Sequence, residues 1–145
     1  KISDIFIKSS KNLRGINCPI NYNSNAIDEF LVIFLVAAKS KGISYFKDLS
    51  ELNQKESPRL VWASKILNLM GIKNLRTKSS IKIFGNPDLK LDKKIVIKNF
   101  SKDHRVFMMS VIAALTFGGE WKIYDLDSIK TSFPKFLQTL KKIKP

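Results

Sequence analysis

The sequence predicts a mixed α/β chain with layered helices and strands, rather than a helical bundle or a β-sandwich. Two observations predict this class: helix-like and strand-like segments alternate over all 145 residues, and one helix–strand segment recurs. The two copies are AAKSKGISYFKDLSEL (37–52) and AALTFGGEWKIYDLDSI (113–129), offset by 76 to 77 residues. Each runs from a helix end through Gly, a strand and Asp-Leu into a turn. We therefore expect two copies of one supersecondary unit.

The first half of the chain is predicted to contain two helices separated by short strands. Apolar residues dominate 26–41 and Gly42 follows, which is the pattern of a buried helix and its stop. Residues 57–70 place their Leu, Ala, Ile and Met side chains on one helical face, and Gly71 ends this helix. Strands are predicted at 4–9, 16–20 and 43–49.

The second half is predicted to contain two further helices and four strands. A helix over 103–117 stops at Gly118-Gly119. A final helix over 132–143 has Ser132 as its N-cap and Pro134 in its first turn. Strands are predicted at 72–76, 81–84, 94–97 and 121–126, with a break at Gly85-Asn86-Pro87 before the third.

The composition, 44% hydrophobic, is typical of a globular domain that buries a core. The longest apolar run, 30–38, is about half the length of a membrane-spanning helix, so no membrane association is expected. No signal-peptide pattern is present, and the chain does not begin with Met, which suggests a fragment or a processed product. The single cysteine, Cys18, and single histidine, His104, provide neither an internal disulfide nor a zinc cluster. We expect a reducing, cytoplasmic setting.

The net charge of +14 has two interpretations. A basic chain can bind nucleic acid. However, the basic residues are mostly Lys scattered along the chain, and only four are Arg, the residue that forks onto phosphate or guanine. A general compositional bias combined with an anionic small-molecule substrate is therefore favoured. A basic nucleic-acid-binding domain is the alternative.

Four polar groupings share one feature: each lies at the start of a predicted helix. In a layered α/β unit, helices that follow parallel strands begin on the same edge of the sheet, where helix dipoles and free N–H groups favour anions. Arginines at that edge can hold carboxylate or phosphate, and acids beside them can move protons. The groupings are Asp28-Glu29, Lys55-Glu56-Arg59, Asp103-His104-Arg105 and Lys130-Thr131-Ser132.

Each grouping also has a purely structural interpretation. Asp28 and Glu29 can cap a helix. The charged residues of 55–59 can form a solvated first turn, His104 can be an ordinary structural histidine, and Ser132 can be an N-cap. The placement that they share favours one common site.

Four motifs in order and spacing resemble the C-terminal part of the 5-enolpyruvylshikimate-3-phosphate synthase family. They are AIDEF (26–30), ELNQKESPRL (51–60), KDHRVFMMSVIAAL (102–115) and SFPKFLQTL (132–140). The resemblance implies the enolpyruvyl transferase fold, which has two globular halves built from repeated βαβαββ-type units. About two units are expected here, with residues 1–145 forming the C-terminal portion of one half-domain.

The resemblance implies a reaction and two catalytic carboxyl groups. The family moves the enolpyruvyl group of phosphoenolpyruvate onto the 5-hydroxyl of shikimate 3-phosphate, through a tetrahedral ketal and without a cofactor. Asp28 matches the carboxylate assigned as base for the hydroxyl. Glu56 matches the acid that protonates the methylene carbon and later takes the proton back.

The resemblance also implies the residues that bind the substrates. Lys55 matches a residue that contacts the phosphate of shikimate 3-phosphate. Arg59 and Arg105 match the arginines that hold phosphoenolpyruvate, and His104 matches a neighbouring hydrogen-bonding residue. Lys130 is a further, weaker candidate, because it lies one position before the site of a lysine that some family members use.

The chain departs from the family patterns at several positions. Pro58 stands where the pattern K-E-S-D-R has Asp, Phe107 stands where D-H-R-I-A-M has Ala, and Thr131 stands in place of the lysine. The family's Lys-Ser, Gly-rich loop and Ser-Ser-Gln segments belong to a portion before residue 1. The resemblance therefore implies that this chain is inactive alone and needs that N-terminal portion. A degenerate, non-catalytic remnant is a second alternative.

Overall fold

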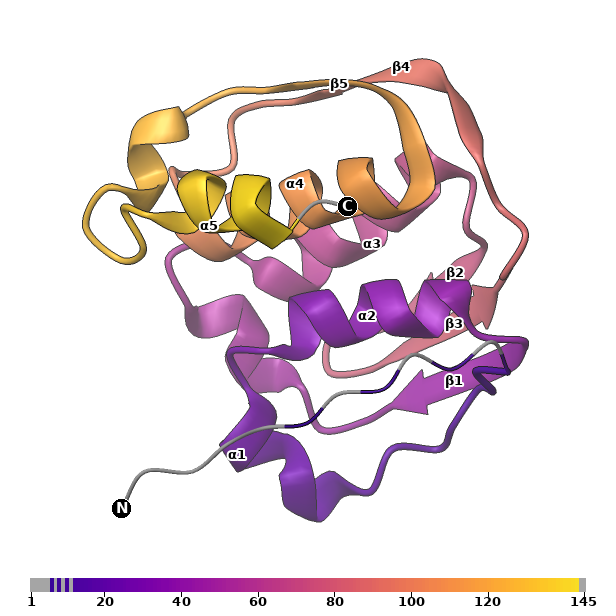
Figure 1. The fold of residues 1–145 in the computed structure, drawn as a ribbon. Helices are drawn as coiled ribbons and strands as arrows, with labels where there is room; N and C mark the ends of the chain where they lie inside the picture. Colours follow the sequence, from indigo (N-terminus) through magenta and orange to yellow (C-terminus); the bar gives the residue numbers. More distant parts are fainter. Residues whose placement is uncertain (1–5, 7, 9, 11, 144–145) are drawn as a thin grey trace.

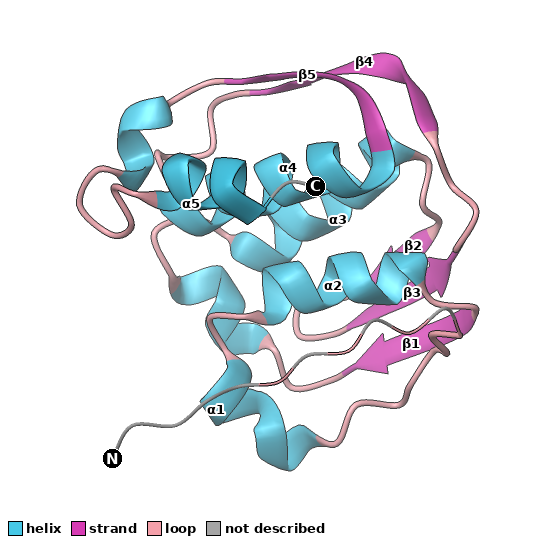
Figure 2. Cartoon of the chain, viewed as in Figure 1, coloured by secondary structure: helices cyan, strands magenta, loops and turns pink. Residues whose placement is uncertain are grey.

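The computed structural model describes residues 6, 8, 10 and 12–143, so the predicted strand 4–9 lies largely outside the described residues. Three helices form the centre of the fold: α2 (Phe30–Lys39), α3 (Arg59–Met70) and α4 (His104–Phe117). They lie side by side, with one sheet on each side of them (Figures 1 and 2). The chain is therefore layered, as the sequence predicts.

The remaining elements are short. The strands are β1 (Gly42–Phe46), β2 (Asn74–Arg76), β3 (Ile81–Gly85), β4 (Leu91–Ile97) and β5 (Gly118–Ile123). The other helical segments are η1 (Ile20–Tyr22), α1 (Asn23–Ala26), η2 (Ser50–Gln54), η3 (Leu126–Ile129) and α5 (Phe136–Ile143).

The strand pairing reveals two units of the same kind. Strands β4 and β5 are parallel and joined through α4, which makes a βαβ unit. Parallel bridges from Arg14 to Lys41 and from Asn17 to Tyr45 place segment 14–17 beside β1, and α2 joins the two. Antiparallel β3 and β2 continue this first sheet in the order β1-β3-β2. The first unit is thus β-α-β-α-β-β, and the second begins in the same way.

The repeat predicted from the sequence has a backbone cause. Gly42 and Gly118 begin the matching strands β1 and β5, 76 residues apart, at φ values of 96° and 78°. Asp48 and Asp125 follow those strands at φ values of 53° and 56°. Positive φ is costly for most residues that have a Cβ. Gly, which has none, adopts it readily, and Asp tolerates it better than most other residues. The Gly and the Asp-Leu recur because both units turn at the same two places.

The predicted helix over 26–41 is wrong in its first turns. Helix α1 ends at Ala26, and α2 begins only at Phe30. Between them, the backbone carbonyl of Asp28 accepts a hydrogen bond from Arg105 Nη1 at 2.7 Å. This carbonyl is thereby used by a side chain from α4, and the break turns Asp28 toward the starts of the other helices.

Two other boundaries differ from the prediction. The predicted strand 16–20 makes only an isolated bridge at Asn17, and η1 follows from Ile20. The predicted helix 132–143 begins only at Phe136, where Thr139 N–H donates to the carbonyl of Lys135 at 2.8 Å. The other predicted helices and strands occur within a few residues of their expected bounds.

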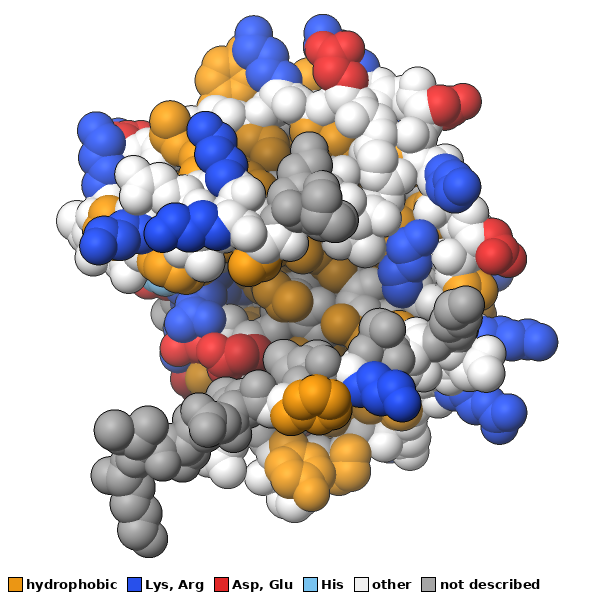
Figure 3. All heavy atoms as spheres, viewed as in Figure 1, with side chains coloured by type: hydrophobic (Ala, Val, Ile, Leu, Met, Phe, Trp, Pro, Cys, Tyr) orange, Lys and Arg blue, Asp and Glu red, His pale blue; other side chains and the backbone are white. Residues whose placement is uncertain are grey.

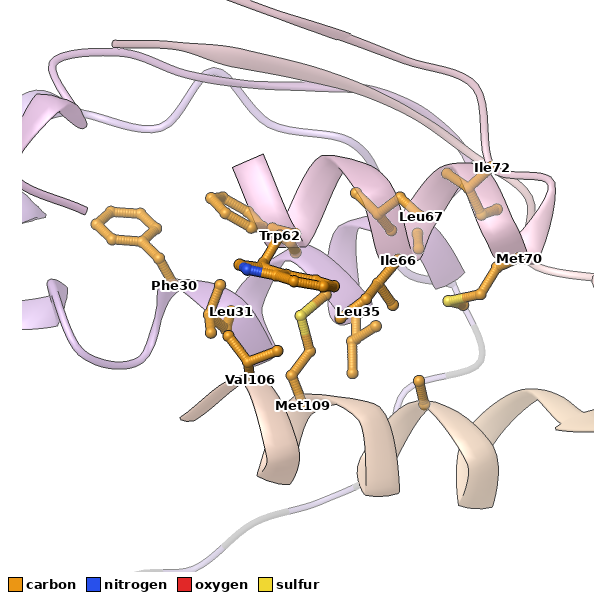
Figure 4. Close-up of a cluster of buried hydrophobic side chains, with 14 of the residues drawn as sticks. Phe30, Leu31, Leu35, Trp62, Ile66, Leu67, Met70, Ile72, Val106 and Met109 are labelled. Atoms are coloured by element: carbon orange, nitrogen blue, oxygen red, sulfur yellow. The ribbon is translucent and has the colours of Figure 1, made fainter. Parts of the chain in front are cut away.

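One hydrophobic core joins the two units. Figure 4 shows Leu35 of α2, Trp62 and Ile66 of α3, and Val106 and Met109 of α4 pointing into the same cluster. All five are at least nine-tenths buried. Burying a large apolar side chain contributes about 1.5–3 kcal/mol, so this cluster fixes the three helices against one another. In the described part of the chain, no helix is long and apolar enough to cross a membrane.

Candidate functional site

Helices α2, α3 and α4 begin on the same side of the molecule (Figure 1). Their N-terminal turns bring charged residues from three distant segments together. Figure 3 shows acidic and basic side chains adjoining at the left edge of the drawn face. The residues joined by hydrogen bonds and ion pairs in this charged cluster are Asp28, Glu29, Glu56, Ser57, Arg59, Asp103, His104 and Arg105.

Arg59 lies at the centre of the charged cluster. Its side chain is only 2% exposed, and each nitrogen of its guanidinium faces a different carboxylate. Nε donates to Asp103 Oδ2 at 2.9 Å, and Nη1 donates to Asp28 Oδ1 at 2.9 Å. Nη2 donates to Glu56. A buried cation needs such partners, because leaving it unpaired costs several kcal/mol.

The carboxylates keep Arg59 charged. Burial alone lowers the pKa of its guanidinium, since the charged form loses water. The hydrogen bond and charge of Asp103, with further contributions from Glu56 and Asp28, outweigh burial and raise the pKa of Arg59 above its ordinary value. Arg59 therefore carries a fixed positive charge throughout the physiological pH range.

Asp103 is fully buried and accepts from two elements at once. Its Oδ2 accepts hydrogen bonds from the Nε of Arg59 and the hydroxyl of Ser57, each at 2.9 Å. Its Oδ1 accepts from the backbone N–H of Arg105 at 2.9 Å and from that of Val106 at 3.4 Å. Asp103 is therefore the N-cap of α4. One carboxylate therefore links the start of α3 to the start of α4.

Arg105 completes the cluster from α4. Its Nη1 lies 3.2 Å from Glu29 Oε1, and its Nη2 lies 3.5 Å from Asp28 Oδ2. Its Nε is buried and has no hydrogen-bond partner among the described residues. Asp28 consequently lies between two guanidinium groups, those of Arg59 and Arg105.

The other predicted site residues take three different positions. His104 Nδ1 lies 3.9 Å from Glu56 Oε1, so this histidine adjoins the cluster. Lys55 Nζ instead forms an ion pair with Glu51 at 2.7 Å on the outside of η2. Lys130 follows η3, and none of the ion pairs of the charged cluster includes it within the described residues.

Sequence reasoning grouped Asp103 with its neighbours but did not select it, and it passed over Ser57. Both are buried, with exposures of 0% and 2%, and the Ser57 hydroxyl donates to the same Asp103 oxygen that accepts from Arg59 Nε. The signal that could have found Asp103 is its place directly before an apolar helix, which is typical of an N-cap.

The arrangement suits the binding of an anion and the movement of protons. Two guanidinium groups face one edge of the fold, at the N-terminal ends of three helices. The carboxylates of Asp28 and Glu56 are 42% and 51% exposed, whereas Asp103 is buried. An incoming carboxylate or phosphate can replace the two exposed groups on Arg59 without disturbing the buried one.

Comparison with known proteins agrees with this fold. The family model of EPSP synthase (3-phosphoshikimate 1-carboxyvinyltransferase) matches residues 3–140. The 3-phosphoshikimate 1-carboxyvinyltransferases of Ruthia magnifica and Thermodesulfovibrio yellowstonii are 37% and 35% identical to the chain. These matches cover 98% and 96% of the chain, but 32% and 31% of the relatives. The chain thus spans about a third of their length.

Solved structures give the same result. EPSP synthase from Acinetobacter baumannii superposes with a TM-score of 0.77 and 30% identity, over 90% of this chain and 30% of that one. The repeated units therefore have the fold of the EPSP synthases. The chain belongs to the EPSP synthase family.

Proposed function

We propose that this chain forms part of the active site of an enzyme that moves the enolpyruvyl group of phosphoenolpyruvate onto the 5-hydroxyl of shikimate 3-phosphate. One observation carries this proposal: Arg59 and Arg105 enclose the carboxylate of Asp28, with Glu56 on the same guanidinium. Membership of the EPSP synthase family supports it.

The two arginines supply the binding of phosphoenolpyruvate. Arg59 and Arg105 each direct N–H donors toward Asp28, so both can reach one anionic group at that position. When phosphoenolpyruvate binds, its oxygens replace the exposed carboxylates on these donors, and the fixed charges stabilise the anion. His104 adjoins Glu56 and is assigned a hydrogen-bonding role there.

The two exposed carboxyl groups supply the proton transfers. Asp28 takes the proton of the 5-hydroxyl as this oxygen attacks C2 of phosphoenolpyruvate, while Glu56 gives a proton to the methylene carbon. The product of this step is a tetrahedral ketal. Glu56 then takes a proton back from the methyl group as the C–O bond to phosphate breaks and phosphate leaves. Two carboxyl groups in different surroundings are what such an addition and elimination needs.

Lysines provide the remaining charges in the proposal. Lys55 is assigned to the phosphate of shikimate 3-phosphate, which requires its side chain to leave Glu51, an exposed ion pair of low energy. Lys130 is a weaker candidate for phosphoenolpyruvate, since it lies outside the cluster in this structure.

The chain provides only part of the site. We assign residues 1–145 to the C-terminal portion of one half-domain, which matches its coverage of about a third of its relatives. In the charged cluster, the carboxylates of Asp28, Glu29, Glu56 and Asp103 outnumber the two arginines. Two anionic substrates require further cations, so the chain alone is expected to be inactive.

A chimaera tests the proposed function. The matching third of the Ruthia magnifica relative is replaced by this chain, and phosphate release from phosphoenolpyruvate plus shikimate 3-phosphate is measured. We expect activity, and a loss of about a hundredfold to ten-thousandfold in Glu56→Gln or Asp28→Asn, because each removes one proton-transfer group.

The matched control is Asp127→Asn, which makes the same chemical change in an exposed ion pair with Lys102, outside the charged cluster. It is expected to leave the rate unchanged. A folded chimaera that releases no phosphate, or one in which Glu56→Gln is as active as the parent, contradicts the proposed function.

A further inference from the structure

We propose that Asp103 is a positioning residue that fixes the two arginines of the site relative to each other. The proposal rests on the proposed function for its catalytic meaning, but the contact on which it depends exists in the chain itself. The carboxylate of Asp103 accepts a hydrogen bond from Arg59 Nε at 2.9 Å. It also accepts one from the backbone N–H of Arg105 at 2.9 Å.

The three carboxylates that pair with Arg59 differ in burial, so one is a permanent partner and two are replaceable. Asp103 occupies the Nε of the guanidinium and is fully buried, whereas Asp28 and Glu56 occupy the Nη atoms and are about half exposed. Substrate oxygens can compete for the Nη donors, but no path from solvent reaches a carboxylate with no exposed surface. Asp103 therefore holds the guanidinium plane while its outer donors exchange partners.

The same carboxylate joins the two repeat units. Arg59 begins α3 of the first unit, and Arg105 lies in the first turn of α4 of the second unit. Oδ2 of Asp103 binds the first helix through Arg59 and Ser57, and Oδ1 binds the second through its N-terminal N–H groups. The separation of the two arginines is thus set through Asp103, and small errors in such positions lower rates steeply.

Asp103→Asn separates these two functions of the residue. Asn is as good an N-cap as Asp, so α4 keeps its cap, but one carboxylate oxygen becomes an NH₂ group that cannot accept from Arg59. Asp103→Ser is the second variant, because Ser also caps a helix and leaves no acceptor within reach of Nε.

The first measurement uses the chain itself. The Nε–H signal of Arg59 in ¹H–¹⁵N spectra should exchange slowly with solvent, since it is buried and bonded to Asp103. In Asp103→Asn and Asp103→Ser this signal should exchange at least tenfold faster, while the amide of Val106 shows whether the cap of α4 remains. A protected Arg59 signal in a folded variant overturns the proposal, whether or not the proposed function is correct.

The second measurement uses the chimaera. Outer partners of binding groups typically change affinity by about tenfold to a hundredfold. We expect both variants to raise KM for phosphoenolpyruvate by about tenfold or more, with a smaller change in KM for shikimate 3-phosphate. A merely structural role would instead lower the amount of folded enzyme and leave both KM values unchanged.

Two controls complete the design. Ser57→Ala removes one hydrogen bond to Oδ2 but leaves the carboxylate on Arg59, so KM should change much less. Asp127→Asn should change nothing. If both Asp103 variants unfold while Ser57→Ala folds, Asp103 serves folding alone and the proposal is wrong. If the parent chimaera is inactive, the proposed function fails, and the exchange measurement still decides the Asp103–Arg59 contact.

Discussion

Arg59 shows how the fold accommodates a buried cation. It is among the largest fully buried side chains of the described chain, and three carboxylates from three segments surround it. Burying ions is costly, and the attraction between them compensates only when every donor finds an acceptor. Here every nitrogen of the guanidinium has one, and two of the acceptors, Asp28 and Glu56, are about half exposed.

Removing the arginine should destabilise the chain strongly. In Arg59→Met, Asp103 is left as a buried charge without its cationic partner, which costs about 3–5 kcal/mol. The double variant Arg59→Met/Asp103→Asn should recover part of this loss, because neither buried charge remains and Asn still caps α4. Urea unfolding of the parent, both single variants and the double variant measures the coupling. Additive effects would show that the two residues do not stabilise each other.

Cys18 gives a prediction about pH. Burial raises the pKa of its thiol above the ordinary value, because the thiolate loses water. At pH 8 the reactive thiolate is then scarcer than in an unfolded chain, so alkylation by iodoacetamide should be slower in the folded protein. The rate should rise toward that of the urea-unfolded control as the pH passes the raised pKa. Equal rates at pH 8 in the folded and unfolded chain would contradict the shift.

At the scale of elements, the helix starts are shaped by what lies before them. Helix α3 begins after Pro58, which offers no side-chain cap, yet its carbonyl still accepts from Trp62 N–H at 3.0 Å. The proline that replaces the family's Asp therefore leaves the backbone of the helix start intact. The change removes the Asp side chain and the backbone N–H of residue 58, and a helix start does not need that N–H for its own hydrogen bonds.

The end of β3 lies so close to the end of α2 that Gly85 should not tolerate a larger side chain. A Cβ at this position, at the end of β3, would lie 2.0 Å from the carbonyl oxygen of Ser40, beyond α2. Gly85→Ala must therefore push the backbone of β3 away from the end of α2. We expect a loss of more than 2 kcal/mol in the free energy of unfolding, as for an overpacked core.

Gly71 provides the matched control for this prediction. It ends α3 at a φ of 85°, but nothing lies within 4 Å of an added Cβ. Gly71→Ala should cost only the strain of the left-handed conformation, about 1–2 kcal/mol. If urea unfolding shows the two substitutions to be equally destabilising, the backbone contact at Gly85 is not limiting.

At the scale of the whole molecule, the two repeat units should unfold together. Trp62 of α3 packs against the first turns of α4, and the same core includes α2. Because neither unit has a separate core, one cooperative transition is expected. Unfolding followed by the fluorescence of Trp62 in Trp121→Phe should coincide with far-UV circular dichroism. Two separated midpoints would instead indicate units that fold independently.

The fold class and most of its elements could be predicted from the amino-acid sequence. Hydrophobic periodicity located α3 and α4, and the repeated Gly and Asp-Leu revealed the two units, because local backbone turns depend on local residues. It also nominated Asp28, Glu56, Arg59, His104 and Arg105 as one group, since all lie near helix starts. Their roles in the reaction remain predictions.

The contacts between these residues could not be predicted from the sequence, because they depend on how the helices pack. No periodicity reports that the carbonyl of Asp28 accepts from Arg105, a contact that lies in the break between α1 and α2. Likewise, the buried contact between Asp103 and Arg59 joins residues 44 positions apart. Such contacts arise from the packing of three helices on one core. Local sequence encodes each helix, whereas their mutual placement, and with it the site, depends on all of them together.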